Sequence, residues 1–272
     1  MIKKFIRKIL GVKNKTDAAG NNMEPDMLGP KQHGIDPKLL SNNAIRVTQT
    51  LQEAGFKAYV VGGAVRDLLL GVKPKDFDIA TNATPEQVKR LFRRAFIIGK
   101  RFQIVHVMFG QDLLEVTTFR GPAATESPKD EHGRVLRDNT FGAHHEDAVR
   151  RDFTINAMYY DPATQTVLDF HGGMADIRKK TLRIIGVPEA RYREDPVRML
   201  RVVRFAARLQ FSIAPDTAAP IAVMAPLINN VPSARVFDEM LKLLLSGQAL
   251  ACLQRLRSEG LHHGLLPLLD VV

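Results

Sequence analysis

Hydrophobic positions recur with two different periods along the chain, and the change of period divides it. Between residues 58 and 185, short apolar runs bounded by glycine and polar residues predict strands, with runs at helical spacing between them. Beyond residue 195 nearly all apolar residues recur at helical spacing. We therefore expect an α/β head, a small mixed sheet with helices, followed by an all-α neck and body region.

The expected elements of the head follow one another closely. Strands are predicted over residues 58–61, 76–79, 102–109, 113–119, 166–170 and 181–185. Helices are predicted over residues 37–54, 64–70, 84–94 and 147–160, and the helical part includes 233–246 and 248–259. The third helix has a capping-box pattern, with Thr84 as N-cap, Pro85 at the first helical position and Gln87 three residues after the cap.

The first 35 residues have the composition of a disordered basic tail and linker. Residues 1–15 carry six lysines and arginines opposite apolar positions at helical spacing, which predicts a short basic amphipathic helix. A weak contact with a membrane surface or a protein is one role for it, and a plain flexible tail is the other. We expect the head over residues 36–190 and the helical part, shorter than a full helical body, over 191–272.

Composition excludes several classes of protein. With 272 residues, 45% hydrophobic and 25% charged, the chain can bury a core and is not disordered throughout. Its single cysteine, Cys252, cannot form a disulfide within the chain. No run approaches the roughly 20 apolar residues of a membrane-spanning helix. We expect a cytoplasmic protein and, although no pattern bears on it, a monomer.

The formal charge of +10 is not spread evenly. Residues 1–15 and 87–111 each carry +6 and residues 178–208 carry +7, whereas residues 112–177 carry −6. Basic blocks beside an acidic one are typical of a protein that holds a polyanion near bound metal ions, although a solvated charged face explains any single block equally well.

A strand that runs through Gly62 and Gly63 directly into a helix is the first candidate site. Glycines let backbone amides approach a ligand closely, and a helix start adds a positive dipole end. The arrangement is typical of phosphate binding, although alone it is also a common tight turn. Arg66 lies on the first turn of that helix.

Asp76 and Asp78 strengthen the phosphate-binding interpretation. Spaced i and i+2 in a predicted strand, their carboxylates point to one face while Phe77 points to the other. Two adjacent carboxylates repel unless a cation lies between them, and Mg²⁺ is the cation that prefers oxygen ligands and substrate phosphates. Two ions about 4 Å apart would suit an in-line phosphoryl transfer.

These motifs resemble one family. The sequences GGAVRDLLLG and PKDFDIAT, RRDFTINAM at 150–158 and EDPVRMLRVVRFAARL at 194–209 are similar to those of the DNA polymerase β-like nucleotidyltransferases, within the group of bacterial tRNA nucleotidyltransferases (CCA-adding enzymes) and poly(A) polymerases. The resemblance runs from about Phe56 to Leu245. It implies a nucleotidyltransferase head, two Mg²⁺ ions or Mn²⁺ in their place, ATP as substrate and RNA 3′ ends as partner.

The resemblance also implies residue roles. Asp76, Asp78 and Asp152 are the expected catalytic acids, of which Asp76 and Asp78 hold metal. The expected nucleotide contacts, with Asp195 and Arg198 as readers of the base, are Gly62, Gly63, Arg66, Arg151, Asn156, Asp195, Arg198 and Arg201.

Two residue roles stay open from the pattern alone. Glu115, in a predicted strand, is a physical rival to Asp152 as the third acid, because Asp152 falls in a predicted helix with Asn156 one turn away. Arg198, Arg201, Arg204 and Arg208 form a stripe on one helix face, which suits phosphate and base recognition but also a structural ion-pair face. The histidines lack the spacing of a zinc site.

Residues 97–107, IIGKRFQIVHV, favour one of the two groups, the CCA-adding enzymes and the poly(A) polymerases. The hydrophobic pair, glycine, two basic residues and phenylalanine resemble the poly(A) polymerase version. We therefore expect template-independent addition of AMP to RNA. The alternatives are CCA addition to tRNA and, because the helical part is short, an RNA-binding protein without catalysis.

Overall fold

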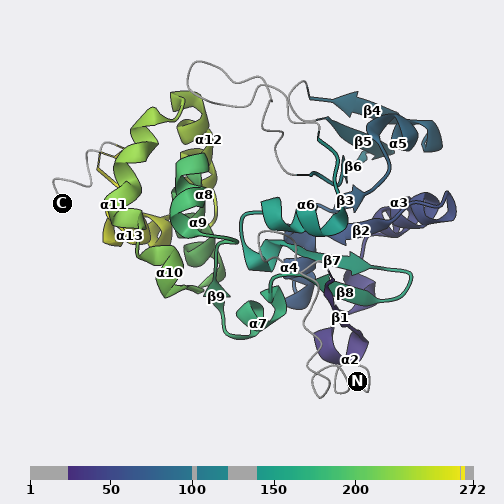
Figure 1. Cartoon of the computed structure of the whole chain (residues 1–272), viewed down its shortest axis with the longest axis horizontal. Coiled ribbons are helices and arrows are strands. Elements are labelled where there is room, and N and C mark those ends of the chain that lie inside the picture. The colour runs from purple at the N-terminus through teal and green to yellow at the C-terminus, as the bar shows by residue number, and fades with distance from the viewer. Residues whose placement is uncertain (1–23, 100–102, 122–139, 264, 267–272) are drawn as a thin grey trace. The chain divides into compact units, whose positions relative to one another are not determined.

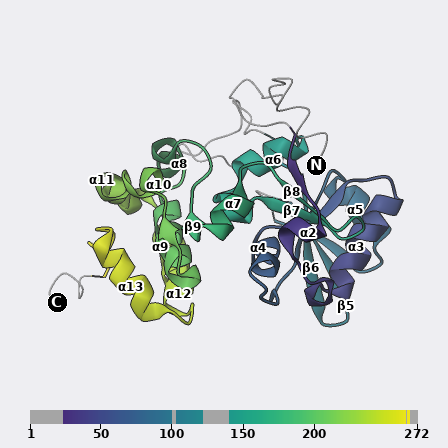
Figure 2. The same ribbon diagram turned by 90° about the horizontal axis from the view of Figure 1, so that it is seen from below.

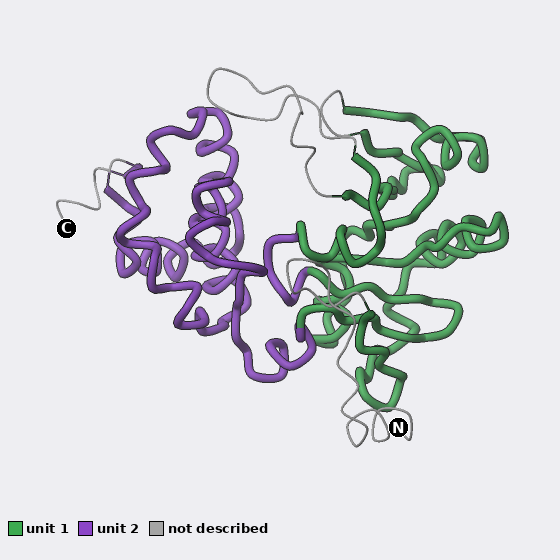
Figure 3. Tube along the Cα trace, in the orientation of Figure 1, with its two compact units in different colours: residues 1–150, 157–171 green, residues 151–156, 172–272 purple. Residues whose placement is uncertain are grey.

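The computed structural model of the protein describes residues 24–99, 103–121, 140–263 and 265–266 (Figure 1). The chain divides into two compact units, which Figure 3 distinguishes by colour. Unit 1 comprises residues 1–150 and 157–171, and unit 2 comprises residues 151–156 and 172–272. The expected classes are confirmed, because unit 1 is a mixed sheet with helices and unit 2 is mainly helical. The basic helix predicted over 1–15 lies outside the described residues.

An eight-stranded sheet forms the centre of unit 1. Among the described strands β3 and β6 pair in parallel, and every other neighbouring pair in this sheet is antiparallel. The order across the sheet is β1 (Asp26–Leu28), β8 (Thr166–Asp169), β7 (Met158–Asp161), β2 (Ala58–Val61), β3 (Asp78–Thr81), β6 (Asp112–Thr118), β5 (Ile104–Phe109) and β4 (Ala95–Ile98).

Helices cover both faces of this sheet (Figure 2). On one face lie α3 (Asn42–Glu53) and α5 (Pro85–Leu91), and on the other lie α4 (Gly63–Leu69) and α6 (His144–Arg150). The short α2 (Pro30–His33) and a 3-10 turn (Pro37–Leu39) precede α3. Because side chains alternate along each strand, each face of the sheet has its own buried residues.

Local sequence signals set the boundaries of two helices. The predicted capping box of α5 is confirmed: the Gln87 amide donates to Thr84 Oγ1 over 3.3 Å, and the Thr84 amide donates to Gln87 Oε1 over 2.8 Å. At the start of α4, Gly62 has φ 74° and ψ −134°, a conformation that side chains disfavour. The Gly62–Gly63 sequence therefore permits the abrupt change from strand β2 to helix α4.

Unit 2 is built around helix α9 (Val197–Leu209), which contacts α8 (Pro188–Glu194), α12 (Ser233–Leu244) and α13 (Ala249–Ser258). Its buried side chains include Met199, Leu200, Val202 and Val203. The remaining elements of the unit are a 3-10 turn (Thr154–Asn156), α7 (Gly173–Arg178), β9 (Thr181–Leu182), β10 (Ser212–Ile213), α10 (Pro215–Ala218), α11 (Ile221–Met224) and a second 3-10 stretch (Ala225–Asn230).

A network of ion pairs links three segments of unit 2. Arg201 on α9 lies 2.5 Å from Asp152 Oδ2 and 3.9 Å from Glu239 on α12. The next arginine along the helix, Arg204, donates through Nε to Glu239 Oε1 over 2.5 Å, and both side chains are buried. Burial lowers the pKa of Arg204, against the opposing attraction of Glu239. A buried pair of this kind is costly to break on one side.

One predicted helix is wrong. The pattern over residues 147–160 predicts a single helix, but α6 ends at Arg150 and residues 158–161 form strand β7 in the middle of the sheet. Asp152 accounts for the break, because its Oδ1 accepts a hydrogen bond from the Phe153 amide over 2.7 Å and so favours a turn. Strand β4 was missed, since four residues beside a basic stretch give little periodicity.

The start of the fold also differs from the prediction. A disordered linker up to residue 35 is wrong from Glu24 onward, because Asp26–Leu28 pair with β8. His33 is buried and its Nε2 lies 3.0 Å from the Gln165 carbonyl oxygen, which ties α2 to the β7–β8 turn. The boundary between the two units also differs from the expected one at residue 190. Residues 172–190 and the short segment 151–156 belong to unit 2 and not to the head.

No helix within the described ranges has both the length and the apolar character needed to cross a membrane.

The buried pair yields a stability prediction. Glu239→Ala should lower the free energy of unfolding by about 3 kcal/mol, because Arg204 is left buried without its carboxylate. The double variant Arg204→Met/Glu239→Leu should recover most of that loss by packing. Urea unfolding followed by helical circular dichroism measures both. Lys242→Ala, an exposed change on the same helix, is the control and should shift stability by less than about 0.5 kcal/mol.

Candidate functional site: a carboxylate edge in unit 1 and an arginine cluster in unit 2

The Gly62–Gly63 turn lies beside one of the predicted acids. Strand β2 ends at Val61, whose cross-strand partner is Asp78, the first residue of β3. The strands are antiparallel, so the turn that leaves β2 and the acid that opens β3 lie at the same edge of the sheet. A Cβ on Gly63 would lie 3.4 Å from the Arg66 guanidinium, in ordinary contact distance.

Arg66, one of the expected nucleotide contacts, is held by its neighbour along α4. Its Nε and Nη2 donate to Asp67 Oδ1 over 2.8 and 2.7 Å, and only 4% of the residue is exposed. The guanidinium therefore has a fixed orientation at the start of α4, with part of its charge balanced by Asp67.

Asp76 and Asp78 are both exposed, with buried Phe77 between them. The predicted alternation is therefore confirmed, although β3 begins only at Asp78 and Asp76 lies in the preceding loop. Carboxylates that are open to solvent can offer oxygen ligands to a cation.

Glu115 is the register partner of Asp78. The two residues are opposite each other on the parallel strands β3 and β6, so their side chains leave the same face of the sheet. The His106 ring on β5, the next strand, has its Nε2 3.5 Å from Glu115 Oε1. Asp78 and Glu115 thus form an exposed carboxylate edge with oxygen donors of the kind that Mg²⁺ prefers.

Within the described parts of the chain, no group of three histidine, cysteine or acidic side chains is arranged to hold a metal ion. A hard cation at the carboxylate edge would therefore complete its shell with water or with substrate phosphates, as Mg²⁺ commonly does.

Asp152 belongs to unit 2 and has a different environment. Its carboxylate accepts from Arg201 Nε over 3.2 Å and from Asn156 Nδ2 over 3.2 Å, besides the Phe153 amide. Burial alone would raise the pKa of Asp152, but the attraction of Arg201 and these hydrogen bonds bring it below its ordinary value. Asp152 and Asn156 are thus neighbours as expected, across a bend and a 3-10 turn rather than along a helix.

Arg198 and Arg201, two of the unit 2 arginines expected at the nucleotide, have acidic or carbonyl partners. Arg198 Nη1 donates to Glu194 Oε2 over 2.7 Å and to the Arg191 carbonyl over 2.9 Å. Arg191 in turn bonds Glu194 over 2.7 Å and, through Nη2, the Arg151 carbonyl over 2.8 Å. The segment that contains Arg151 is therefore fastened to α8.

Only one carboxylate oxygen of Asp195, the residue expected to read the base, has a hydrogen-bond donor among the described residues. Its Oδ2 accepts from Arg235 Nη2 over 2.5 Å, whereas its Oδ1 is buried and accepts no hydrogen bond from the described residues. A buried acceptor without a donor is unfavourable in a protein and suits recognition of an exocyclic amino group.

Sequence reasoning missed three partners of these residues: Arg191, Arg235 and Glu239. Arg235 and Asp195 are 40 positions apart, and Glu239 and Arg204 are 35 apart, so no local spacing could have joined them. The His144 ring stacks against both Tyr59 and Phe119, with centroids 4.8 and 4.7 Å away.

Comparison with known proteins finds two matching family models. Residues 58–183 match the poly A polymerase head domain, which contains the Gly62–Gly63 turn and the carboxylate edge. Residues 210–272 match a family described as the probable RNA and SrmB-binding site of polymerase A.

Similar proteins belong to two groups. The chain is 50% identical over 271 residues to poly(A) polymerase I of Salmonella typhi, covering 97% of this chain and 58% of that one. It is 41% identical over 222 residues to the CCA-adding enzyme of Bacillus subtilis, covering 82% and 55%. The chain thus spans little more than half the length of these relatives.

A solved structure is similar too. The Bacillus stearothermophilus CCA-adding enzyme in complex with CTP superimposes with a TM-score of 0.70 at 39% identity, covering 82% of this chain and 54% of that one. The two chains therefore share a similar arrangement of strands and helices over the matched region. The motifs, the fold and the matched head domain together show that the chain belongs to the family of bacterial poly(A) polymerases and CCA-adding nucleotidyltransferases.

Proposed function

We propose that the protein transfers AMP from ATP to RNA 3′ ends without a template. The observation that carries this proposal is the carboxylate edge: Asp78 and Glu115 lie opposite each other on adjacent strands, and the Gly62–Gly63 turn leaves β2 next to Asp78. The motif resemblance and the 50% identity to poly(A) polymerase I support adenylate addition over CCA addition.

Each part of the reaction has residues to support it. Asp76 and Asp78 would hold Mg²⁺, which when bound supplies electrostatic stabilisation of the transferring phosphoryl group. Backbone amides of Gly62 and Gly63, with Arg66, would contact the triphosphate. The RNA 3′-hydroxyl would attack the α-phosphorus and release its proton to solvent, the bond between the α-phosphorus and the oxygen that bridges to the β-phosphorus would break, and pyrophosphate would leave.

The base is read by protein side chains in this proposal. Asp195 Oδ1 is available to accept a hydrogen bond from the adenine amino group, and Arg198 can donate to a ring nitrogen. Arg151, Asn156 and Arg201 complete the nucleotide contacts that we propose. Cytosine has a similar amino group and a similar ring nitrogen acceptor. These two side chains alone therefore do not distinguish adenine from cytosine, and further contacts must select the base.

The roles of Asp152 and Glu115 differ in this proposal. Asp152 was expected as the third acid, but its oxygens bond Arg201 and Asn156. We propose that Asp152 acts by positioning Arg201, and that Glu115 supplies the third carboxylate beside Asp78. A cytoplasmic location, a monomeric state and a contact made by the basic tail stay predictions.

Primer extension tests the function itself. With an oligo(A) primer, the protein should make long products from ATP alone and little product from CTP alone. The second substrate is a tRNA that lacks its CCA end, again with each nucleotide separately. Gel electrophoresis of the labelled RNA measures product length and nucleotide use.

Two outcomes would contradict adenylate addition. Incorporation of CTP into the shortened tRNA, followed by a single AMP, would make the chain a CCA-adding enzyme, a function favoured by the solved relative bound to CTP. RNA binding without extension under any nucleotide would make it a non-catalytic binding protein.

Asp78→Ala tests the metal assignment. Extension should fall by at least about a thousandfold, because the loss of a metal ligand removes several kcal/mol of transition-state stabilisation. RNA retention on a filter should change little, since Asp78 does not contribute positive charge. Glu86→Gln, which removes one exposed charge on α5, is the control and should retain activity. Unchanged extension by Asp78→Ala would refute the metal assignment.

Neutral variants test whether Glu115 or Asp152 is the third acid that binds metal. Glu115→Gln should raise the Mg²⁺ concentration needed for half-maximal extension about tenfold, because one oxygen ligand loses its charge. Asp152→Asn should leave that Mg²⁺ concentration unchanged and raise KM for ATP, because Arg201 is no longer held by a charged partner. The reverse pattern would make Asp152 the third metal acid.

A further inference from the structure

One line of side chains crosses the entire sheet of unit 1. Cross-strand partners lie opposite each other on the same face, so consecutive partners form a continuous row. From the β1 edge to the β4 edge the row consists of Met27, Leu168, Tyr159, Val61, Asp78, Glu115, His106 and Phe96.

The two halves of this row differ in burial. Leu168, Tyr159 and Val61 pack in a buried cluster with Ala148 of α6. From Asp78 onward the row is accessible, with 46% of the Glu115 side chain and 22% of the His106 side chain exposed. Asp78 thus lies at the border between the covered half of this face and the accessible half.

The accessible half ends on an exposed aromatic ring. Phe96, on edge strand β4, is 55% exposed, and Ile98 two residues further is 36% exposed. A single exposed apolar residue is ordinary. Here, however, the ring stands in register with an imidazole and with the acid that we assign to the metal. Three strand spacings separate Phe96 from Asp78, about 14 Å.

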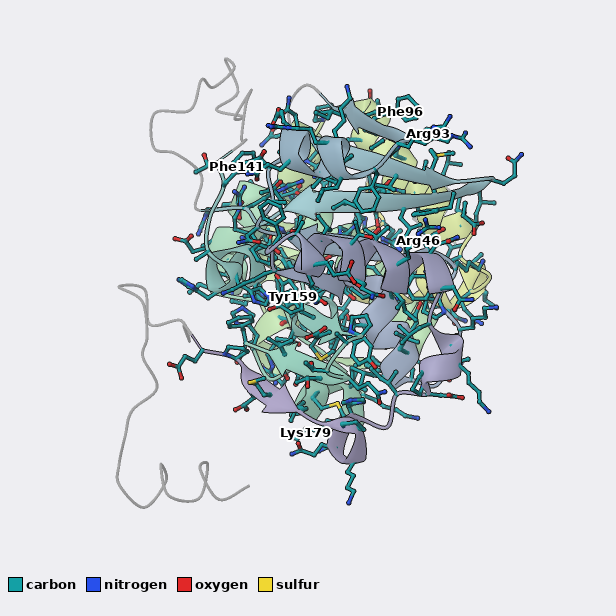
Figure 4. The ribbon with its side chains drawn as sticks, turned by 90° about the vertical axis from the view of Figure 1, so that its right-hand side faces the viewer. Arg46, Arg93, Phe96, Phe141, Tyr159 and Lys179 are labelled. Atoms are coloured by element: carbon teal, nitrogen blue, oxygen red, sulfur yellow. The ribbon has the colours of Figure 1, made fainter. Side chains whose placement is uncertain are left out.

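Positive charge surrounds the same edge. Residues 87–111 contain six lysines and arginines and no acid. Of these, Arg93 and Arg94, in the turn that leads from α5 into β4, are exposed and form no ion pair within the described residues. Figure 4 shows Arg93 and Phe96 at this edge of the sheet. Uncompensated cations beside an exposed ring are the combination that binds single-stranded nucleic acid.

We propose that Phe96 is a stacking platform for an unpaired base of the RNA primer, with the row through His106 and Glu115 leading the strand to its 3′ end at Asp78. The inference rests on the proposed function and adds a binding position to it. Stacking accepts every base because every base has a π face, so the platform would hold primers of different sequence. The exposed cations at the edge would contact the phosphates.

A fluorescent adenine analogue tests the stacking directly. The analogue loses fluorescence when it stacks, and it is placed in turn at each of the last positions of a short RNA. One position should be quenched on binding to the wild-type protein. Phe96→Ala should abolish that quenching and raise the dissociation constant of the RNA about five- to tenfold, the effect of losing one stacked base.

Two further variants make the result specific. Phe96→Tyr keeps the ring and should restore both quenching and affinity. Met27→Ala removes an exposed apolar side chain, 68% exposed, from the same row at the opposite edge of the sheet, and should have no effect on either measurement. In extension assays Phe96→Ala should raise KM for the primer but not KM for ATP.

Three outcomes would overturn the platform. Quenching that survives in Phe96→Ala would place the stacked base elsewhere. An equal loss of quenching and of RNA affinity in Met27→Ala would show that removing any exposed apolar side chain from the sheet weakens RNA binding. A dimer of the wild-type protein that Phe96→Ala dissociates, measured by light scattering, would make β4 a contact between two copies. Failure of the wild-type protein to extend RNA with ATP would instead refute the proposed function. The quenching and affinity measurements need no extension, so they test the platform separately.

Discussion

The pairing of Val61 with Asp78 is the constraint on which the candidate site depends. It brings the end of strand β2 next to the start of β3, so the glycine turn and the first acid of the sheet share one edge. Side chains alternate faces, and a slip of one residue would move Asp78 from the face that carries Val61 to the opposite face, where Ile79 is buried. The buried cluster of Val61, Ala80 and Tyr159 opposes such a slip, because these three side chains fill the covered half of the face on which Asp78 lies. The hydrophobic core therefore fixes where the acid points.

The same argument extends one strand further. Because β3 and β6 are parallel, Glu115 comes into register with Asp78 although 37 positions separate them in the sequence. The parallel pair needs a crossover, and the segment with α5, β4 and β5 supplies it. That crossover also carries the basic residues and Phe96 to the far edge of the sheet. The fold thus arranges an acid, an imidazole and an aromatic ring in one line through backbone register alone.

Much of the head could be predicted from the sequence because its signals are local. The capping box at Thr84, the strand at 58–61 and the Gly62–Gly63 turn each involve a few adjacent residues, and the structure contains all three. The helix over 147–160 could not be predicted correctly, because Met158–Asp161 become a central strand only when β2 and β8 lie on either side. Glu115 could be suspected, but its register with Asp78 depends on the pairing of distant strands. The partners of Asp195 and Arg204 lie on another helix and have no signal in their own segments.

The ion pairs in the structure distinguish two basic segments that look alike in the sequence. Residues 178–208 carry +7 along the sequence, yet Arg183, Arg201 and Arg204 are paired with Asp176, Asp152 and Glu239, acids that lie outside that segment. Much of this charge therefore holds unit 2 together and orients the guanidinium groups. Since an ion pair reduces the field of both members beyond a few ångströms, these arginines are suited to short-range contacts with a nucleotide. The cations of residues 89–94 lack such partners among the described residues, so their field reaches further and suits attraction of an RNA strand. The two basic blocks therefore have different physical roles although their charges are nearly equal.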